Sequence, residues 1–135
     1  FTPEMALLLD ADRTRAAPHI LPQEASPFVP RLAALAREHG LTLVVGSLPV
    51  AADESRAANR TMVFAPDALA AITYDKIHMF DVDLASGESW RESRAYRAGE
   101  SVVVAEDTPL GRLGLAICYD MRFPALFEAL GRKAC

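Results

Sequence analysis

Cys118 stands where an expected strand gives way to an expected helix. Residues 113–117 alternate large apolar with small side chains, which is typical of a strand buried on both faces. Residues 119–122 turn the chain, and Pro124 favours a helix that begins there, because its missing N–H costs nothing in a first turn. A cysteine at such a corner faces free backbone N–H groups, and the helix N-terminus favours its thiolate. The same placement also suits a cysteine that is only a small buried apolar residue.

A cysteine nucleophile needs a base that accepts its proton and a positive group that stabilises the oxyanion. Glu4 follows a proline at the expected end of a strand, where apolar neighbours would make a carboxylate a stronger base. Lys76 follows another expected strand and could supply the cation. Taken singly, the two residues are more typical of a solvated loop glutamate and a surface lysine.

Other chemistries have weaker support in the residues. His19 lies in a proline-rich loop, His39 on a helix face, and His78 suits a structural role. Cys118 and Cys135 lack the paired spacing of zinc ligands and the C-x-x-C pattern of a thiol redox protein. We therefore expect no metal and no cofactor.

The elements that must position these residues follow from hydrophobic periodicity and from the placement of glycine and proline. They indicate an α/β layered domain with a mixed sheet, in which a hairpin interrupts an otherwise parallel order. We expect a helix over 26–39, strands over 41–47, 59–65, 70–74, 101–106 and 113–117, a helix from 124, and irregular segments over 10–27, 49–58 and 75–97.

Composition narrows the function classes. Of the 135 residues, 51% are apolar, which is enough for a globular core. The net charge of −4 comes from interspersed acidic and basic residues without a basic stripe, so we expect no nucleic-acid partner. No apolar run approaches the roughly 20 residues of a membrane span, so we expect no membrane partner. With no signal peptide evident and no disulfide framework, we expect a cytoplasmic protein.

Four short segments together resemble the nitrilase superfamily of carbon–nitrogen hydrolases. They are residues 2–5 (TPEM), 74–83 (YDKIHMFDVD), 91–93 (RES) and 114–124 (GLAICYDMRFP). They present Glu, Lys, Glu and Cys in the family's order, and the last segment and KIHMFDVD resemble the Nit branch, the amidases of ω-amides and deaminated glutathione.

The resemblance implies a role for each matched residue. Cys118 would be the nucleophile and Glu4 the general base. Lys76 would bind the oxyanion together with the backbone N–H of Tyr119, and Glu92 would orient Lys76 or a substrate amine. The implied reaction is hydrolysis of an amide through a cysteine thioester, with release of ammonia from a small ω-amide or deaminated glutathione. Carbamoyl or nitrile hydrolysis, or an inactive binding or scaffold protein of the same fold, are the alternatives.

The resemblance also implies an architecture. The family's domain is an α-β-β-α sandwich, roughly twice the length of this chain, that forms dimers or larger homo-oligomers. On this basis we expect residues 1–135 to be the N-terminal part of a single carbon–nitrogen hydrolase domain, truncated at both ends and inactive when isolated. The expected partner is a small-molecule amide substrate.

Three further residues in or near the last segment have expected structural roles. Asp120 suits a cap of the helix that follows, and Arg122 a pair with a carboxylate such as Glu128. Cys135 stands where a next strand would begin and suits a core position.

If residues 1–135 are part of a larger sandwich, strands are left with bare edges and uncovered faces when the segment is expressed alone. We expect the isolated segment to be insoluble or molten. Circular dichroism during heating measures this, and a cooperative thermal transition would contradict the expectation.

Overall fold

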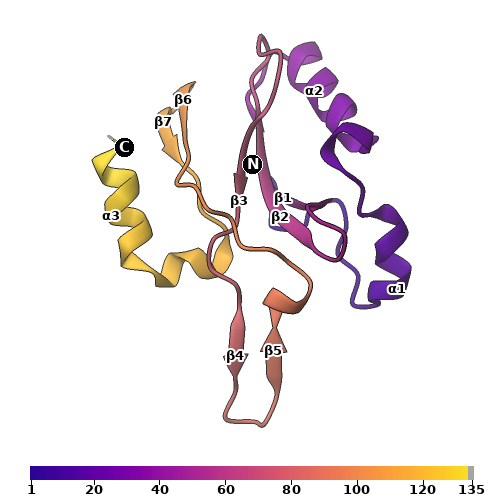
Figure 1. Cartoon of the computed structure of the whole chain (residues 1–135). Coiled ribbons are helices and arrows are strands. Elements are labelled where there is room, and N and C mark those ends of the chain that lie inside the picture. Colours follow the sequence, from indigo (N-terminus) through magenta and orange to yellow (C-terminus); the bar gives the residue numbers. More distant parts are fainter. Residues whose placement is uncertain (134–135) are drawn as a thin grey trace.

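An antiparallel three-stranded sheet in the order β1-β2-β3 forms the centre of the structure, which is a computed structural model that describes residues 1–133 (Figure 1). The strands are β1 (Leu43–Ala51), β2 (Ala57–Phe64), β3 (Ile72–Asp75), β4 (Asp81–Asp83), β5 (Ser89–Arg91), β6 (Val104–Thr108) and β7 (Gly111–Gly114). The helices are α1 (Arg13–Ala16), α2 (Phe28–Glu38) and α3 (Pro124–Arg132), with 3₁₀ turns η1 (Ala17–His19), η2 (Gln23–Ala25), η3 (Glu92–Arg94) and η4 (Cys118–Arg122).

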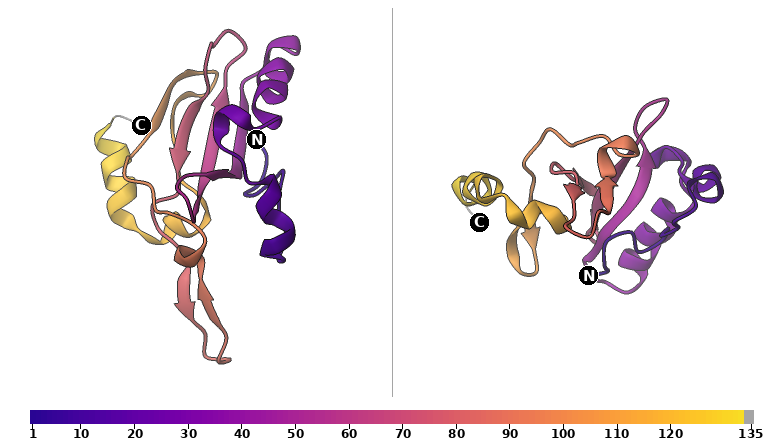
Figure 2. Two further views of the ribbon diagram at one scale, coloured as in Figure 1. Left: turned by 45° about the vertical axis from the view of Figure 1, so that its right-hand side comes forward. Right: turned by 90° about the horizontal axis from the view of Figure 1, so that it is seen from below.

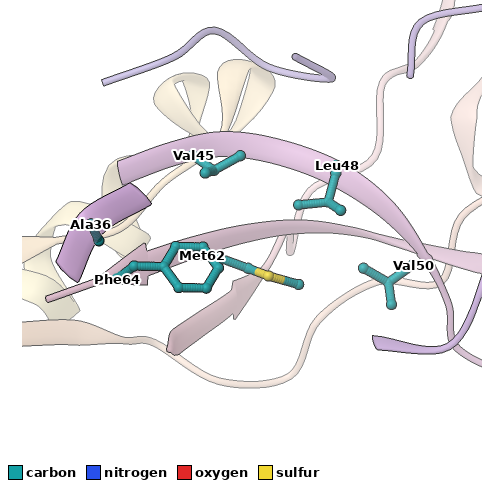
Figure 3. Packing of buried hydrophobic residues seen from close by; sticks show 6 residues of the cluster. All are labelled: Ala36, Val45, Leu48, Val50, Met62 and Phe64. Atoms are coloured by element: carbon teal, nitrogen blue, oxygen red, sulfur yellow. The ribbon is translucent and has the colours of Figure 1, made fainter. Parts of the chain in front are cut away.

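One face of this sheet packs against α2. Residues of β1 and β2 that point to this face form a buried cluster with Ala36 of α2, and Figure 3 shows their side chains. Val29, Leu32 and Ala33 extend the contact along the helix, at the spacing of one helical face. The cluster consists of Ala36, Val45, Leu48, Val50, Met62 and Phe64.

The other face of the sheet is covered by the later part of the chain. Successive side chains of a strand point to opposite faces, so Val44 and Val63 face away from α2. They pack with Tyr74 of β3 and with Leu115 and Ile117, which directly precede Cys118. Figures 1 and 2 show the β6–β7 hairpin and α3 on this side of the sheet, opposite α2. This packing brings the segment that carries Cys118 to the sheet.

The β4–β5 hairpin projects from the rest of the chain, as Figure 1 and the left view of Figure 2 show. Its strands pair Val82 with Trp90, and the Trp90 side chain is more than half exposed. The hairpin ends directly before Glu92, so its base lies at the candidate site.

The direction of strand pairing differs from the expectation. Every pairing between the named strands is antiparallel, and the parallel contact among the described residues is an isolated bridge between Ala57 and Tyr96. The mixed sheet with a mostly parallel order was therefore wrong for residues 1–133. Apolar runs signal burial, but they do not specify which neighbour a strand pairs with.

Several expected boundaries were also wrong. The strand expected over 113–117 ends at Gly114, because beyond it no ladder of strand pairing continues; the Leu115 N–H donates to the Val103 carbonyl, and the Ile117 carbonyl already accepts from the turn that follows. The expected burial on both faces was wrong too, since Leu115 and Ile117 are buried but Ala116 is exposed. The strand expected over 101–106 lies at Val104–Thr108. The segments expected to be irregular contain α1, η1, η2, the ends of β1 and β2, the β4–β5 hairpin and η3. The helices at Phe28–Glu38 and Pro124–Arg132 and the β2–β3 hairpin confirm the remaining expectations. None of the described helices is both long and apolar enough to cross a bilayer.

A close backbone approach at Gly46 connects the N-terminal segment to β1. The pairing of β1 with β2 shifts register between Val45 and Leu48, and Gly46 lies in this irregular stretch. A Cβ at Gly46 would lie 2.2 Å from the Thr2 carbonyl oxygen and 2.7 Å from the Pro3 carbonyl carbon, both backbone atoms. Only glycine permits this contact, which holds the residues immediately before Glu4 against the strand.

We expect Gly46→Ala to lower the free energy of unfolding by about 1–3 kcal/mol, since the added methyl group overpacks against backbone that must shift. Gly131→Ala in α3 is the matched control, because its Cβ meets nothing within 4 Å. In a helix this control should raise stability by roughly 0.5–1 kcal/mol. Chemical denaturation of the full-length protein measures both values, and similar effects of the two substitutions would contradict the role of the close approach.

Candidate active site

Four segments that are distant in sequence bring Glu4, Lys76, Glu92 and Cys118 together. The Lys76 ammonium lies between the two carboxylates, with its Nζ 3.2 Å from Glu4 Oε1 and 2.9 Å from Glu92 Oε2. A second contact, of 3.1 Å, joins Nζ to Glu92 Oε1. The Lys76 side chain is 2% exposed, so the ion pairs form away from bulk water.

The Lys76 ammonium remains charged in this environment. Burial lowers the pKa of Lys76, but the hydrogen bonds and negative charges of Glu92 and Glu4 outweigh it, and the pKa is raised above its usual value. A group with a raised pKa keeps its proton at neutral pH. The site therefore contains a fixed, buried positive charge next to the candidate nucleophile.

The main chain positions Glu4 through contacts with β1. The N–H of Thr2 donates to the Val44 carbonyl at 3.0 Å, and the N–H of Met5 donates to Ser47 Oγ at 2.9 Å. Met5 adopts a φ of 54°, in the left-handed region that side chains other than glycine rarely occupy. This turn reverses the chain directly after Glu4 and leaves the Glu4 carboxylate directed at Lys76.

Glu92 is held from the base of the β4–β5 hairpin. Its Oε2 accepts a hydrogen bond of 2.7 Å from the backbone N–H of Phe80, and its own N–H donates to the Phe80 carbonyl at 3.3 Å. The carboxylate therefore has a fixed orientation, with donors from Lys76 on one side and Phe80 on the other.

Cys118 begins the 3₁₀ turn η4 and has a φ of 47°. Like Met5, it is a residue other than glycine in the left-handed region, and such backbone strain concentrates at functional sites. The thiol-bearing residue is exposed among the described residues. The first N–H groups of a turn have no partner within it, which leaves those of Cys118 and Tyr119 without an acceptor in the turn.

The protonation state of Cys118 differs from the expectation. Although the residue is exposed overall, partial desolvation of its sulfur raises the pKa of the thiol, and the negative charge of Glu4 and a hydrogen bond with it raise the pKa further. The Lys76 charge lowers it, as expected, but does not outweigh these effects. The expected thiolate was therefore wrong, because desolvation of the sulfur and the Glu4 carboxylate outweigh the Lys76 charge. At rest the site contains a neutral thiol with its acceptor in place.

Asp120 ties the Cys118 turn to the segment that carries Lys76. Its carboxylate is fully buried and accepts hydrogen bonds from Tyr74 Oη at 2.6 Å, from the His78 N–H at 2.9 Å and from the Ile117 N–H at 2.9 Å. His78 Nδ1 lies 2.7 Å from the same carboxylate. Burial and the Asp120 carboxylate raise the pKa of Tyr74 strongly, so its phenol stays protonated as a donor.

These contacts correct two expectations and support a third. Asp120 does not cap α3, which has no side-chain cap; its bonds hold the preceding turn instead. Glu128 pairs with Arg132 at 2.5 Å and not with Arg122. His78 is structural, since its ring also stacks on Phe123 with centroids 3.7 Å apart. Cys135, expected in the core, lies outside the described residues.

Sequence reasoning missed Asn59. This residue is fully buried in β2, and its Nδ2 donates to Glu4 Oε1 at 2.7 Å. The signal that could have revealed it was an asparagine at the start of an expected strand, because a polar side chain that becomes buried needs a partner.

The described residues hold no group of three or more His, Cys, Asp or Glu side chains that could bind a metal ion. A cavity of about 310 Å³ is lined by Thr73, Asp75, Arg97, Gly99, Ser101 and their neighbours and includes none of the four candidate residues. The arrangement that remains is a thiol, an adjacent carboxylate acceptor and a buried cation, which can carry out nucleophilic acyl transfer.

Comparison with known proteins identifies the class. A family model described as carbon-nitrogen hydrolase matches residues 1–135, and the chain belongs to this family. The fold is accordingly of the nitrilase type, as expected, and the chain represents part of its sandwich.

Individual relatives indicate which members of the family the chain is similar to. A deaminated glutathione amidase of Yersinia enterocolitica is 41% identical over 132 residues, which are 96% of this chain and 46% of the relative. The omega-amidase NIT2 of Homo sapiens is 37% identical over 78% of this chain and 37% of its own length. Among solved structures, Saccharomyces cerevisiae Nit3, a member of branch 10 of the nitrilase superfamily, matches with a TM-score of 0.74 and 30% identity, over 97% of this chain and 45% of Nit3. The chain thus spans less than half the length of each of these proteins.

The opposing effects of Glu4 and Lys76 on the thiol give a test. Glu4→Gln removes the negative charge that raises the pKa of Cys118, so iodoacetamide alkylation at neutral pH should become roughly threefold to tenfold faster. Lys76→Met removes the charge that lowers this pKa and should slow alkylation. Mass spectrometry of the Cys118 peptide over a range of pH measures both rates.

Lys133→Met, at an exposed lysine, is the control and should leave the alkylation rate of Cys118 unchanged. Identical rates in the wild type, Glu4→Gln and Lys76→Met would show that neither charge acts on the thiol.

Proposed function

We propose that the full-length protein carrying this chain is a cysteine-dependent amidase that releases ammonia from a small amide. The observation that supports it best is the Lys76 ammonium, buried between Glu4 and Glu92, together with a Cys118 thiol whose pKa responds to the charges of all three residues. An acyl-transfer enzyme needs a nucleophile, a base within hydrogen-bonding reach and a fixed cation for the oxyanion, and these residues match that set.

In the first step, the Glu4 carboxylate accepts the thiol proton as the Cys118 sulfur attacks the amide carbon. The carbonyl oxygen becomes negative, and the Lys76 ammonium and the Tyr119 N–H stabilise it. The C–N bond then breaks, and the leaving amine takes the proton from Glu4 and departs as ammonia. The products of this half-reaction are a thioester on Cys118 and an ionised Glu4. The raised pKa of the thiol suits this sequence, because it keeps the proton in place until the substrate arrives.

In the second step, Glu4 accepts a proton from water, and the resulting hydroxide attacks the thioester carbon. The C–S bond breaks, the carboxylic acid product leaves and the sulfur regains its proton from Glu4. Glu92 keeps Lys76 in position through both steps or orients a substrate amine. Glu4 thus serves as base and acid in turn. Lys76 Nζ contacts Glu4 through one carboxylate oxygen, Oε1, and this single ion-pair contact leaves the carboxylate able to take up and return a proton.

The proposed substrate is a small ω-amide or deaminated glutathione, by similarity to relatives named omega-amidase and deaminated glutathione amidase. Carbamoyl compounds and nitriles would use the same four residues and are the second choice. We further propose that residues 1–135 form the N-terminal part of one hydrolase domain that is a homo-oligomer when complete.

The test is ammonia release by the full-length protein from ω-amides of dicarboxylic and 2-oxo acids and from deaminated glutathione. Cys118→Ala should abolish release, and Glu4→Gln should lower kcat about a hundredfold or more. Glu38→Gln, at an exposed glutamate of α2, is the matched control and should retain activity.

Release that survives in Cys118→Ala would remove the thioester mechanism. A folded protein that releases no ammonia from this panel, carbamoyl compounds or nitriles would identify an inactive binding member of the fold instead.

A further inference from the structure

The Asn59 side chain, on β2, contacts both carboxylates of the candidate site. Its Nδ2 lies 2.7 Å from Glu4 Oε1 and 3.4 Å from Glu92 Oε1, and the residue is fully buried. Glu4 Oε1 and Glu92 Oε1 are also atoms that Lys76 Nζ contacts, so each accepts from one charged and one neutral donor.

The amide has one orientation that makes these bonds. Asn59 Oδ1 has no hydrogen-bond partner among the described residues although it is buried. An unpaired buried oxygen is costly, and native proteins seldom retain one without a reason. Rotating the amide would direct Oδ1 at two carboxylates, where like partial charges repel. The unpaired oxygen is therefore the cost of keeping Nδ2 on Glu4 and Glu92.

The main chain of Asn59 contacts the lysine as well. Its carbonyl accepts the Lys76 N–H at 2.9 Å, while its backbone pairs with Pro49 in the centre of the sheet. A single residue in a rigid strand is thus bonded to the backbone of Lys76 and to both carboxylates that flank the Lys76 ammonium. Such an anchor can hold reacting groups to within a fraction of an ångström.

We propose that Asn59 is a positioning residue that acts through Glu4 and Glu92: its side-chain amide holds the two carboxylates on either side of Lys76 and keeps Glu4 directed at the Cys118 thiol. The inference rests on the proposed function. A neutral donor suits this role because a second cation would stabilise the Glu4 carboxylate too strongly for it to accept and return a proton. Among residues 1–133, the ionisable side chains that interact with both carboxylates are Lys76, Cys118 and Tyr96.

The test uses two variants of similar volume in the full-length protein. Asn59→Leu removes the donor without adding charge, and Asn59→Asp replaces the donor with a third carboxylate. We expect each to lower kcat about a hundredfold with less than about a threefold change in KM, since a misdirected base slows chemistry more than binding. In Asn59→Asp the acid limb of the kcat profile should move up by about one pH unit, because three adjacent carboxylates favour protonation.

Thr61→Val is the matched control. Thr61 lies on the same strand and face as Asn59, and its Oγ1 donates a hydrogen bond of 2.7 Å to the Gly46 carbonyl. The substitution removes this hydrogen bond. This variant should melt at a lower temperature yet keep the kcat and pH profile of the wild type. Melting curves of all variants separate the loss of folded protein from the loss of chemistry.

Alkylation of Cys118 provides a readout that needs no substrate. In Asn59→Leu the released Glu4 should hold the thiol proton less well, so that alkylation reaches half its maximal rate at a lower pH. If the alkylation profile shifts but the protein releases no ammonia from any amide, the positioning role of Asn59 is supported and the proposed function is refuted. Wild-type kcat and alkylation profiles in a folded Asn59→Leu variant would overturn the proposal. Loss of folding in both Asn59 variants would assign the residue to sheet stability and overturn it too.

Discussion

The buried charge of Lys76 is the constraint on which the rest of the site depends. Removing an ammonium from water costs several kcal/mol unless opposite charges and hydrogen bonds replace the lost hydration. Glu4 and Glu92 supply that replacement, but they come from the N-terminal segment and from the base of a hairpin, far from Lys76 in sequence. The chain can bury the lysine only by bringing both segments to the end of β3. One ion-pair cluster therefore couples the fold to the candidate chemistry.

A second polar centre, Asp120, performs the same task for the nucleophile. Its four contacts join the end of β3, the residues after Lys76 and the turn that begins with Cys118. Unusual backbone features lie near these polar centres. Any residue other than glycine at position 46 would clash with the backbone of the N-terminal segment, and Met5 and Cys118 adopt left-handed conformations. Strain of this kind persists only where the surrounding contacts determine the conformation.

The nearby charges have opposite effects on the protonation of Lys76 and Cys118. Lys76 stays positive because two carboxylates outweigh its burial, whereas Cys118 stays neutral because partial desolvation of the sulfur and the Glu4 charge outweigh the lysine. A neutral thiol beside a carboxylate is less reactive at rest than a thiolate would be. This division of roles agrees with membership of the carbon–nitrogen hydrolase family, in which the chain matches relatives named as amidases over less than half their length.

Local patterns in the sequence were sufficient for some features. The helix period of residues 28–38, the proline that starts α3 and the hairpin of β2 and β3 depend on neighbours in sequence, and the four short segments containing Glu4, Lys76, Glu92 and Cys118 indicated the family. Strand direction, the partners of Asp120, the place of Asn59 and the protonation of Cys118 were decided by the tertiary structure. Asn59 meets Glu4 across 55 positions of sequence, and Asp120 meets His78 across 42. The pKa of a thiol depends on the balance of burial and several nearby charges, and that balance exists only once the folded chain sets the distances.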